Sequence, residues 1–225
     1  MHGVQNGSRR GAAQYLKGWK LGLSLGPVLG ANPPDILFTY KALIEHPEVS
    51  RAAGGWVYRG QFFADYLHMG GASHMIAREA LRVCKGRGVD IGAGIWPLPG
   101  AIPIDIWRGP GAERSLEQVS SGELDYIFSS HCLEHIDDWE TALTDWTKLV
   151  RPGGKAFLYL PHPDCLIWQP GSPFVGNEHR WSPSPLVIKD ALQERGLEVE
   201  AADDGPDHYW SFFVCAAKPA AGHQA

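Results

Sequence analysis

The order of apolar runs and helical patterns after residue 88 predicts an α/β fold, a Rossmann-like doubly wound sheet covered by helices. Short apolar strands alternate there with amphipathic stretches, as in parallel sheets whose strands are joined by crossover helices. A glycine turn at residues 92–94 follows the first of these strands, where open sheets of this kind bind ligands. The chain has 225 residues, of which 44% are hydrophobic, enough to bury a core. We therefore expect one such domain with additions.

Six strands are expected in the sheet, at residues 89–91, 102–106, 124–129, 155–160, 197–201 and 209–217. The clearest helix spans 137–150, because Trp139, Leu143 and Trp146 recur at helical spacing. Asp137 and Glu140 can form a capping box at its start. The stretch RPGG at 151–154 then ends this helix before the next strand.

Further helices are predicted on either side of this region. Ser184 as N-cap, Pro185 in the first turn and Gly196 at the end define one helix. Upstream, helices are expected at 36–45 and at 73–84, the latter with Ser73 as N-cap. Residues 1–85 are expected to form a helical and aromatic extension that packs as a lid on a domain of residues 86–219, with 220–225 as a tail.

Composition limits the class of partner. The formal net charge is −5 and the pI about 6.0, which argues against binding of nucleic acid or of an anionic membrane by bulk charge. The four cysteines are far apart and indicate neither a zinc ribbon nor a disulfide scaffold. The apolar stretch 21–31 is interrupted by glycines and is too short to span a bilayer. We expect a cytoplasmic protein, monomer or homodimer, with a small-molecule partner.

A nucleoside-bearing cofactor is indicated by the glycine turn and an acid downstream. Asp90, Gly92, Ala93 and Gly94 belong to the turn after the first strand, and Asp105 ends the next strand, where its carboxylate can accept both hydroxyls of a ribose. A dinucleotide would require a third glycine at position 97 and a helix facing its pyrophosphate. Prolines stand at positions 97 and 99 instead, which predicts a loop in place of the first crossover helix. S-adenosylmethionine (SAM) has no phosphate and suits this loop.

Five motifs in order resemble the class I SAM-dependent methyltransferases of the type 11 group. They are the turn at 89–94, Asp105, the strand at 124–130, HCLEHI at 131–136 and LVRPGG at 149–154. The resemblance covers about residues 88–219. It implies a seven-stranded sheet whose last strand is antiparallel, SAM across the carboxyl ends of the first strands, and methyl transfer to oxygen or nitrogen of a small-molecule acceptor.

The resemblance also implies which residues contact SAM. Gly92 and Gly94 would line its methionine and ribose, and Asp105 would hold the ribose hydroxyls. The other contacts are Ile106 and Trp107 at the adenine, and Ser129, Ser130 and His131 at the methionine. Because the first crossover is short, we expect Tyr66 and His68 from the aromatic segment to complete the outer wall of the site. Packing of these aromatic residues in a core is the alternative.

Two histidines are expected near the acceptor. The sulfonium of SAM is a strong methyl donor, so alignment and exclusion of water are the main tasks, and a base is needed only for a hydroxyl or a protonated amine. His131 is the first candidate base and His162 the second, with a role in shaping the pocket as the alternative. The long loop 161–183 and the aromatic segment are expected to form the acceptor pocket, or else a packed insertion.

Two functions of other classes remain open from these residues. His131, Glu134 and His135 match the H-x-x-E-H pattern of a zinc metallopeptidase, although the motif directly follows a buried strand instead of lying within a long helix. In the methyltransferase interpretation Glu134 and His135 serve the start of a helix and no metal is expected. A non-catalytic SAM-binding module would retain the fold, but the intact turn, acid and polar strand tip argue against it.

Overall fold

A computed structural model describes residues 43–68, 71–94, 96–105, 116 and 119–220. They form two compact units: the first takes in the described residues up to 68 together with the loop tip 171–176, and the second takes in the rest. Among these residues, no helix is both long and apolar enough to cross a membrane.

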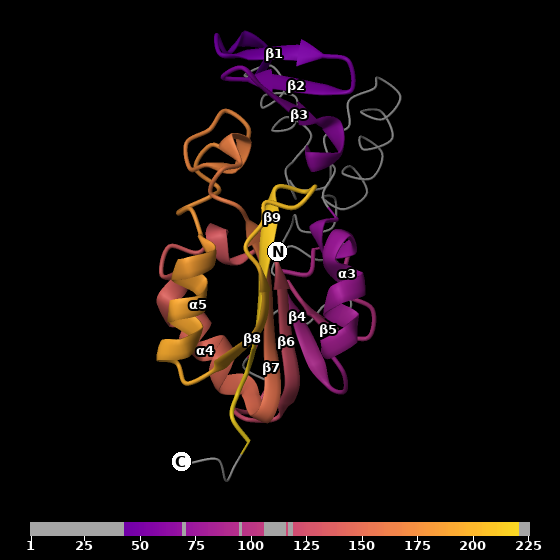
Figure 1. Cartoon of the computed structure of the whole chain (residues 1–225), viewed down its shortest axis with the longest axis vertical. Coiled ribbons are helices and arrows are strands. Elements are labelled where there is room, and N and C mark those ends of the chain that lie inside the picture. Colours follow the sequence, from indigo (N-terminus) through magenta and orange to yellow (C-terminus); the bar gives the residue numbers. More distant parts are fainter. Residues whose placement is uncertain (1–42, 69–70, 95, 106–115, 117–118, 221–225) are drawn as a thin grey trace, which may run out of the picture. The chain divides into compact units, whose positions relative to one another are not determined.

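The first unit contains an antiparallel sheet of three strands, β1 (Val49–Ala52), β2 (Gly55–Tyr58) and β3 (Gln61–Ala64), followed by the 3-10 helix η1 (Asp65–His68) (Figure 1). Arg59 and Gly60 connect β2 to β3 with φ of 50° and 80°, the conformation of a two-residue hairpin turn. The sequence predicted helices on either side of the aromatic run and no strands within it; the hairpin forms because turn residues interrupt this run at hairpin spacing. Of the helix predicted at 36–45, only 43–45 lie among the described residues, and they are helical.

Aromatic side chains form the core of this unit. Trp56 and Tyr58 are buried, and the ring of Phe174 meets both edge-on, at centroid distances of 6.1 and 5.6 Å. The tip of the loop 161–183 thus packs with the aromatic segment, as expected for those two segments. For Trp56, Tyr58 and Phe174 the contact is core packing of the kind that stabilises aromatic clusters.

The second unit contains a mixed sheet with strand order β5-β4-β6-β7-β9-β8. The strands are β4 (Gly88–Ile91), β5 (Ile102–Ile104), β6 (Leu124–Ser130), β7 (Val150–Pro161), β8 (Glu198–Asp203) and β9 (Ser211–Ala217). The first four are mutually parallel, and β9 runs antiparallel to both of its neighbours. This confirms the Rossmann-like fold with an antiparallel last strand. The described residues supply six strands where the resemblance implies seven, and most of residues 106–118 lie outside them.

Helices cover both faces of this sheet. Figure 1 shows α3 (Ala72–Val83) on one face and α4 (Trp139–Leu149) and α5 (Pro185–Glu194) on the other. The core cluster between sheet and helices includes Leu143 and Trp146 of α4 and Ile188 of α5. Because α3 packs against β6 and β7, it belongs to the second unit, which begins at residue 71, whereas the sequence placed the boundary at 85.

The helix ends follow the expected chemistry, with two shifts. Ser184 caps α5 by accepting a hydrogen bond from the backbone N–H of Val187, as predicted. Helix α3 instead begins after Gly71, whose φ is 78°, and the predicted cap Ser73 is buried inside the first turn. The cap of α4 is Asp138, one residue beyond the predicted Asp137.

Replacing Asp138 by alanine should lower the free energy of unfolding by about 1 kcal/mol, the usual cost of losing an N-cap. Its carboxylate accepts the backbone N–H of Thr141 at 3.2 Å, and alanine leaves that donor without its partner. Asp137→Ala is the matched control and should change stability by less than about 0.5 kcal/mol, because Asp137 makes only a 3.8 Å ion pair with Arg180 on the surface. Urea unfolding of both variants tests this, and equal losses would contradict the assignment of the cap.

Candidate cofactor and active site

The turn after β4 contains two glycines, Gly92 and Gly94, which differ in the space around them. Gly92 has φ of 77° and Gly94 φ of 53°, a region that glycine enters without strain. A Cβ added to Gly92 would lie 2.4 Å from Cβ and 2.5 Å from Sγ of Cys132, so only glycine fits there. A Cβ added to Gly94 would meet no atom of the described residues within 4 Å. Gly92 is thus required for packing, whereas Gly94 borders open space on which a ligand can lie.

The predicted acid meets this turn. Asp105 directly follows β5, and its Oδ2 accepts a hydrogen bond from the backbone N–H of Gly94 at 2.7 Å. The backbone N–H groups of Gly92 and Ala93 both donate to the carbonyl of Ile104, at 2.9 and 3.2 Å. The turn is therefore tied to the end of β5, and the acid and the glycines that the sequence placed together are together in the structure.

Asp90 lies beneath the turn. Its side chain is fully buried in β4, and its Oδ2 accepts a hydrogen bond from the backbone N–H of Leu98 at 2.7 Å. The described residues of the stretch 92–101 contain no helix, as expected from the prolines at 97 and 99. The hydrogen bond between the Asp90 carboxylate and the N–H of Leu98 holds the crossover loop in place.

The tip of β6 contains two serines, Ser129 and Ser130, which differ in the hydrogen bonds of their hydroxyl groups. Ser129 donates from its hydroxyl to the carbonyl of Ile91 at 2.8 Å, which ties β6 to the end of β4. Ser130 is buried, and its Oγ has no hydrogen-bond partner among the described residues. A buried polar atom without a partner is costly unless a ligand supplies one. Ser130 therefore fits a position against a bound molecule.

His131 follows at the tip with φ of 49°, a conformation that is uncommon for residues with a side chain and often occurs at functional sites. Its Nε2 lies 2.8 Å from Oγ of Ser211, and that hydroxyl already donates to the carbonyl of Tyr209. Nε2 of His131 is therefore the donor, and Nδ1, with its lone pair, lies 3.6 Å from Oε1 of Glu134. Burial lowers the pKa of His131 well below its usual value, so the ring is neutral.

Aromatic rings enclose the His131 imidazole. The ring centroids of Trp168, Tyr159 and Tyr209 lie 4.7, 5.5 and 5.6 Å from its own. Because both nitrogens of His131 already face protein groups, this arrangement favours a role in positioning over direct proton transfer to an acceptor. His131 is the first candidate base expected from the sequence, and its role as a base stays a prediction.

His162, the second candidate base, directly follows β7. Its Nδ1 accepts a hydrogen bond from the backbone N–H of Asp164 at 3.1 Å, which places the ring proton on Nε2 when the ring is neutral. The backbone N–H of His162 donates to the carbonyl of Trp210. His131 and His162 thus follow the ends of two neighbouring strands, at the same edge of the sheet.

Four of the predicted residues remain to be considered. Ile106 and Trp107 fall outside the described residues. Tyr66 and His68 belong to η1 of the first unit, so the site built here from the second unit alone does not include them. The exposed fraction of Tyr66 is 38%.

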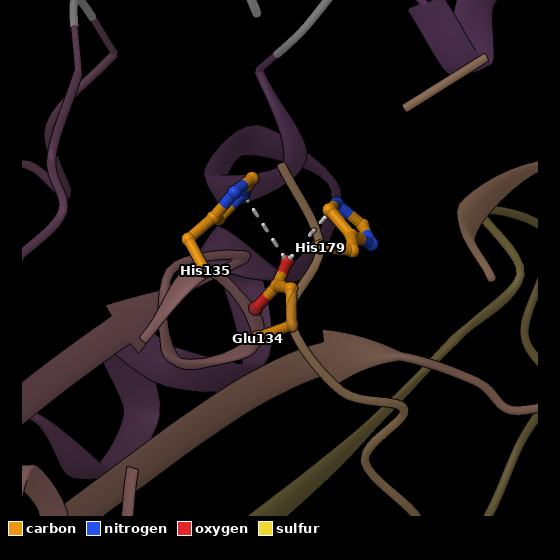
Figure 2. Close-up of side chains that lie close together, drawn as sticks. All are labelled: Glu134, His135 and His179. Atoms are coloured by element: carbon orange, nitrogen blue, oxygen red, sulfur yellow. Dashed lines mark ion pairs between the residues drawn. The ribbon is translucent and has the colours of Figure 1, made fainter. Parts of the chain in front are cut away.

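Beside His131, two residues of the H-x-x-E-H pattern converge with a histidine that is not part of it. Glu134 and His135 belong to the 3-10 helix η3 (Leu133–His135), and His179 comes from the insertion after β7. Figure 2 shows the three side chains converging, with Oε1 of Glu134 3.8 Å from Nε2 of His135 and 4.0 Å from Nε2 of His179. Burial raises the pKa of Glu134 to about 8 and lowers that of His179 to about 4. The local sequence gave Glu134 and His135 a role at a helix start, and His179 is too distant in the chain for a spacing rule.

Comparison with known proteins places this site in a family. Residues 49–202 match the profile of the methyltransferase domain family. No curated protein sequence matches the chain. Among solved structures, a SAM-dependent methyltransferase from Mesorhizobium loti is 17% identical with a TM-score of 0.48, and the alignment covers 66% of this chain and 98% of that one.

A Burkholderia thailandensis 1,6-didemethyltoxoflavin-N1-methyltransferase, solved with its substrate and S-adenosylhomocysteine, is 13% identical with a TM-score of 0.48. That alignment covers 97% of this chain and 93% of that one. A possible histamine N-methyltransferase from Thermotoga maritima is 16% identical with a TM-score of 0.45, over 65% of this chain and 90% of that one.

The family match covers more than half of the chain, so the protein belongs to the methyltransferase domain family. It is a class I methyltransferase, an enzyme that uses SAM. The metallopeptidase alternative fails on geometry as well, because η3 contains only three residues, whereas a peptidase would hold the H-x-x-E-H residues within a long helix.

Proposed function

We propose that the enzyme methylates a nitrogen or oxygen atom of a small molecule, with SAM bound across the carboxyl ends of β4, β5 and β6. The observation that carries this proposal is the pairing of the Asp105 carboxylate with the Gly94 N–H at 2.7 Å. This contact holds the acid beside the glycine turn, where a ribose would approach both. The space beside Gly94 would receive a ligand of that kind.

The residues present fit SAM better than a nucleotide. The turn is followed by a loop in place of a helix, so it offers no helix N-terminus to a pyrophosphate. Ser130 supplies a buried hydroxyl that lacks a protein partner, at the strand tip where the methionine part is expected. Gly92 and Ala93 would contact the ligand through backbone atoms, with Ser129 and Asp90 behind them. When bound, SAM supplies an electrophilic methyl group on a sulfonium.

The work left to the protein is alignment and exclusion of water. His131 is neutral and braced by Ser211 and by aromatic rings, so it would shape the acceptor side of the site as a positioning residue. Because Nε2 of His131 donates to Ser211 and Nδ1 faces the Glu134 carboxyl group, acceptors that already carry a lone pair at neutral pH are favoured. Aromatic ring nitrogens, neutral amines and acidic phenols are of this type.

The experiment is methyl transfer from labelled SAM to a panel of phenols, amines and nitrogen heterocycles, with polypeptides as a separate arm. His131→Gln should retain kcat within about tenfold, because removal of a general base would cost about 10²–10⁴-fold. The pH dependence of kcat/KM should follow the ionisation of the acceptor, and changing the acceptor should move the inflection.

Three outcomes would count against this proposal. Label that enters only polypeptides would exclude a small-molecule acceptor. A loss of kcat beyond about 100-fold in His131→Gln, with KM unchanged, would make His131 the base. An inflection near neutral pH that stays fixed across acceptors would point to a base on the enzyme.

A further inference from the structure

We propose that Glu134, His135 and His179 bind a divalent transition-metal ion, Zn²⁺ by preference, through one carboxylate oxygen and two imidazole nitrogens. The three ligand atoms lie within 4.8 Å of one another, and they point at a common centre (Figure 2). On a tetrahedral zinc ion with bonds of ~2.0–2.1 Å such atoms lie about 3.3 Å apart. The largest separation would have to shorten by up to about 1.5 Å, so shifts of up to about 0.8 Å in each side chain would close the site.

Both histidines have the tautomer that a metal requires. Nδ1 of His135 lies 3.0 Å from the carbonyl of Glu178, and Nδ1 of His179 lies 2.7 Å from the carbonyl of Trp168. A carbonyl only accepts, so each Nδ1 carries the proton and each Nε2 carries a lone pair. Both lone pairs face Glu134. Backbone carbonyls orient metal-binding histidines in this way in established sites.

Without a cation this cluster is poorly satisfied. Glu134 is fully buried, and neither of its carboxylate oxygens has a hydrogen-bond partner among the described residues. A proton on the carboxyl group would serve one histidine at most, and the 3.8 and 4.0 Å separations exceed hydrogen-bond length. A metal ion satisfies all three groups at once. Nδ1 of His131, 3.6 Å from Oε1 of Glu134, is the nearest further nitrogen, and it can complete a tetrahedral set.

The chemistry of the three ligands indicates which metal ion would bind, and their surroundings indicate what the ion would do. Two imidazoles with one carboxylate suit zinc and its neighbours, whereas magnesium and calcium prefer all-oxygen sites. The His135 side chain is 35% exposed, which gives the ion a path from solvent. The insertion already meets the tip of β6 through Arg180 N–H to the Glu134 carbonyl at 2.8 Å. A metal at His179 would fasten the insertion at this same place, beside His131.

Zinc binding to the full chain, stripped of metal with a chelator, tests the proposal by calorimetry and by metal analysis. Wild type should take up one zinc per chain and no magnesium. His135→Ala and His179→Ala should weaken zinc binding at least about 100-fold, since even groups that only orient a ligand are worth 10–100-fold. His208→Ala, an exposed histidine outside the cluster, should bind as wild type. His135 is the most exposed of the three, so its variant is expected to fold, and circular dichroism checks this.

Glu134→Gln adds a test in which zinc should reverse the order of the melting temperatures of variant and wild type. Without zinc the variant should melt at a higher temperature than wild type, because it removes a buried carboxylate that lacks partners. With zinc the order should invert, since only wild type gains the stabilisation that ligand binding to the native state provides. The proposal is overturned if wild type holds no stoichiometric zinc, if His208→Ala loses as much affinity as His179→Ala, or if Glu134→Gln melts higher under both conditions.

Discussion

Replacing Asp105 by alanine should weaken SAM binding by about 100-fold or more while leaving the fold intact. The proposed site gives this carboxylate two ribose hydroxyls, and a hydrogen bond to a charged group is worth about 1.5–3 kcal/mol. Losing both would cost about 3 kcal/mol, and 1.4 kcal/mol corresponds to tenfold in affinity. The N–H of Gly94 also loses the acceptor that it has at 2.7 Å. Calorimetry with SAM and with S-adenosylhomocysteine measures the effect.

Two further variants define what the carboxylate does. Asp105→Asn keeps one acceptor oxygen and should lose about tenfold, less than the alanine variant. Asp164→Ala removes an exposed carboxylate, 73% exposed, near the end of β7, and should bind SAM as wild type. If Asp105→Ala binds as tightly as wild type, or if Asp164→Ala loses as much, the proposed cofactor site is in the wrong place.

Gly92→Ala should be the most destabilising single change at the turn, by about 2–5 kcal/mol. A Cβ at this position would lie 2.4 and 2.5 Å from two atoms of Cys132, and overpacking of this kind costs about 1–3 kcal/mol. The positive φ of 77° adds about 1–2 kcal/mol for a residue with a side chain. Chemical denaturation of the free protein measures the loss.

Gly94→Ala is the matched control for Gly92→Ala. It carries only the backbone penalty, about 1–2 kcal/mol, because its Cβ would meet no protein atom within 4 Å. Its larger effect should fall on SAM affinity, since the added methyl group projects into the space assigned to the ligand. A double-mutant cycle of Gly92→Ala with Cys132→Gly should recover the overpacking part, a coupling of about 1–3 kcal/mol. Equal stability of the two alanine variants would contradict this division of roles.

Local patterns predicted the sheet and the cofactor turn well. Strands, glycine turn and acid depend on periodicity and backbone preference, which neighbouring residues express without reference to the rest of the chain. Asp105 was predicted to lie beside the glycine turn because parallel strands end at a common edge of the sheet. The hydrogen bond between Asp105 and Gly94 confirms this placement. The prolines at 97 and 99 likewise determined the loop that replaces the first crossover helix.

Local patterns did not predict the contacts between residues far apart in the chain. No strands were expected in the aromatic run, but the residues at 59–60 turn it into a hairpin whose aromatic side chains pack on Phe174. His131 was expected as a base on its position alone. Its hydrogen bond with Ser211 and the 3.6 Å approach of its Nδ1 to Glu134 exist only because β9 and η3 meet the tip of β6, and its role as a base stays a prediction that His131→Gln tests.

The sequence by itself therefore determined the strands of the sheet and the turn with its acid, because these follow from short-range conformational preference and from a repeated pattern. The class of enzyme was indicated by the resemblance of its five motifs to a known family. Only the tertiary structure decided that Glu134, buried after β6, faces His135 and a histidine from the insertion. The physical reason is that burial and convergence are properties of the packed chain: a carboxylate's solvation and the direction of an imidazole lone pair depend on the carbonyls and strands around them.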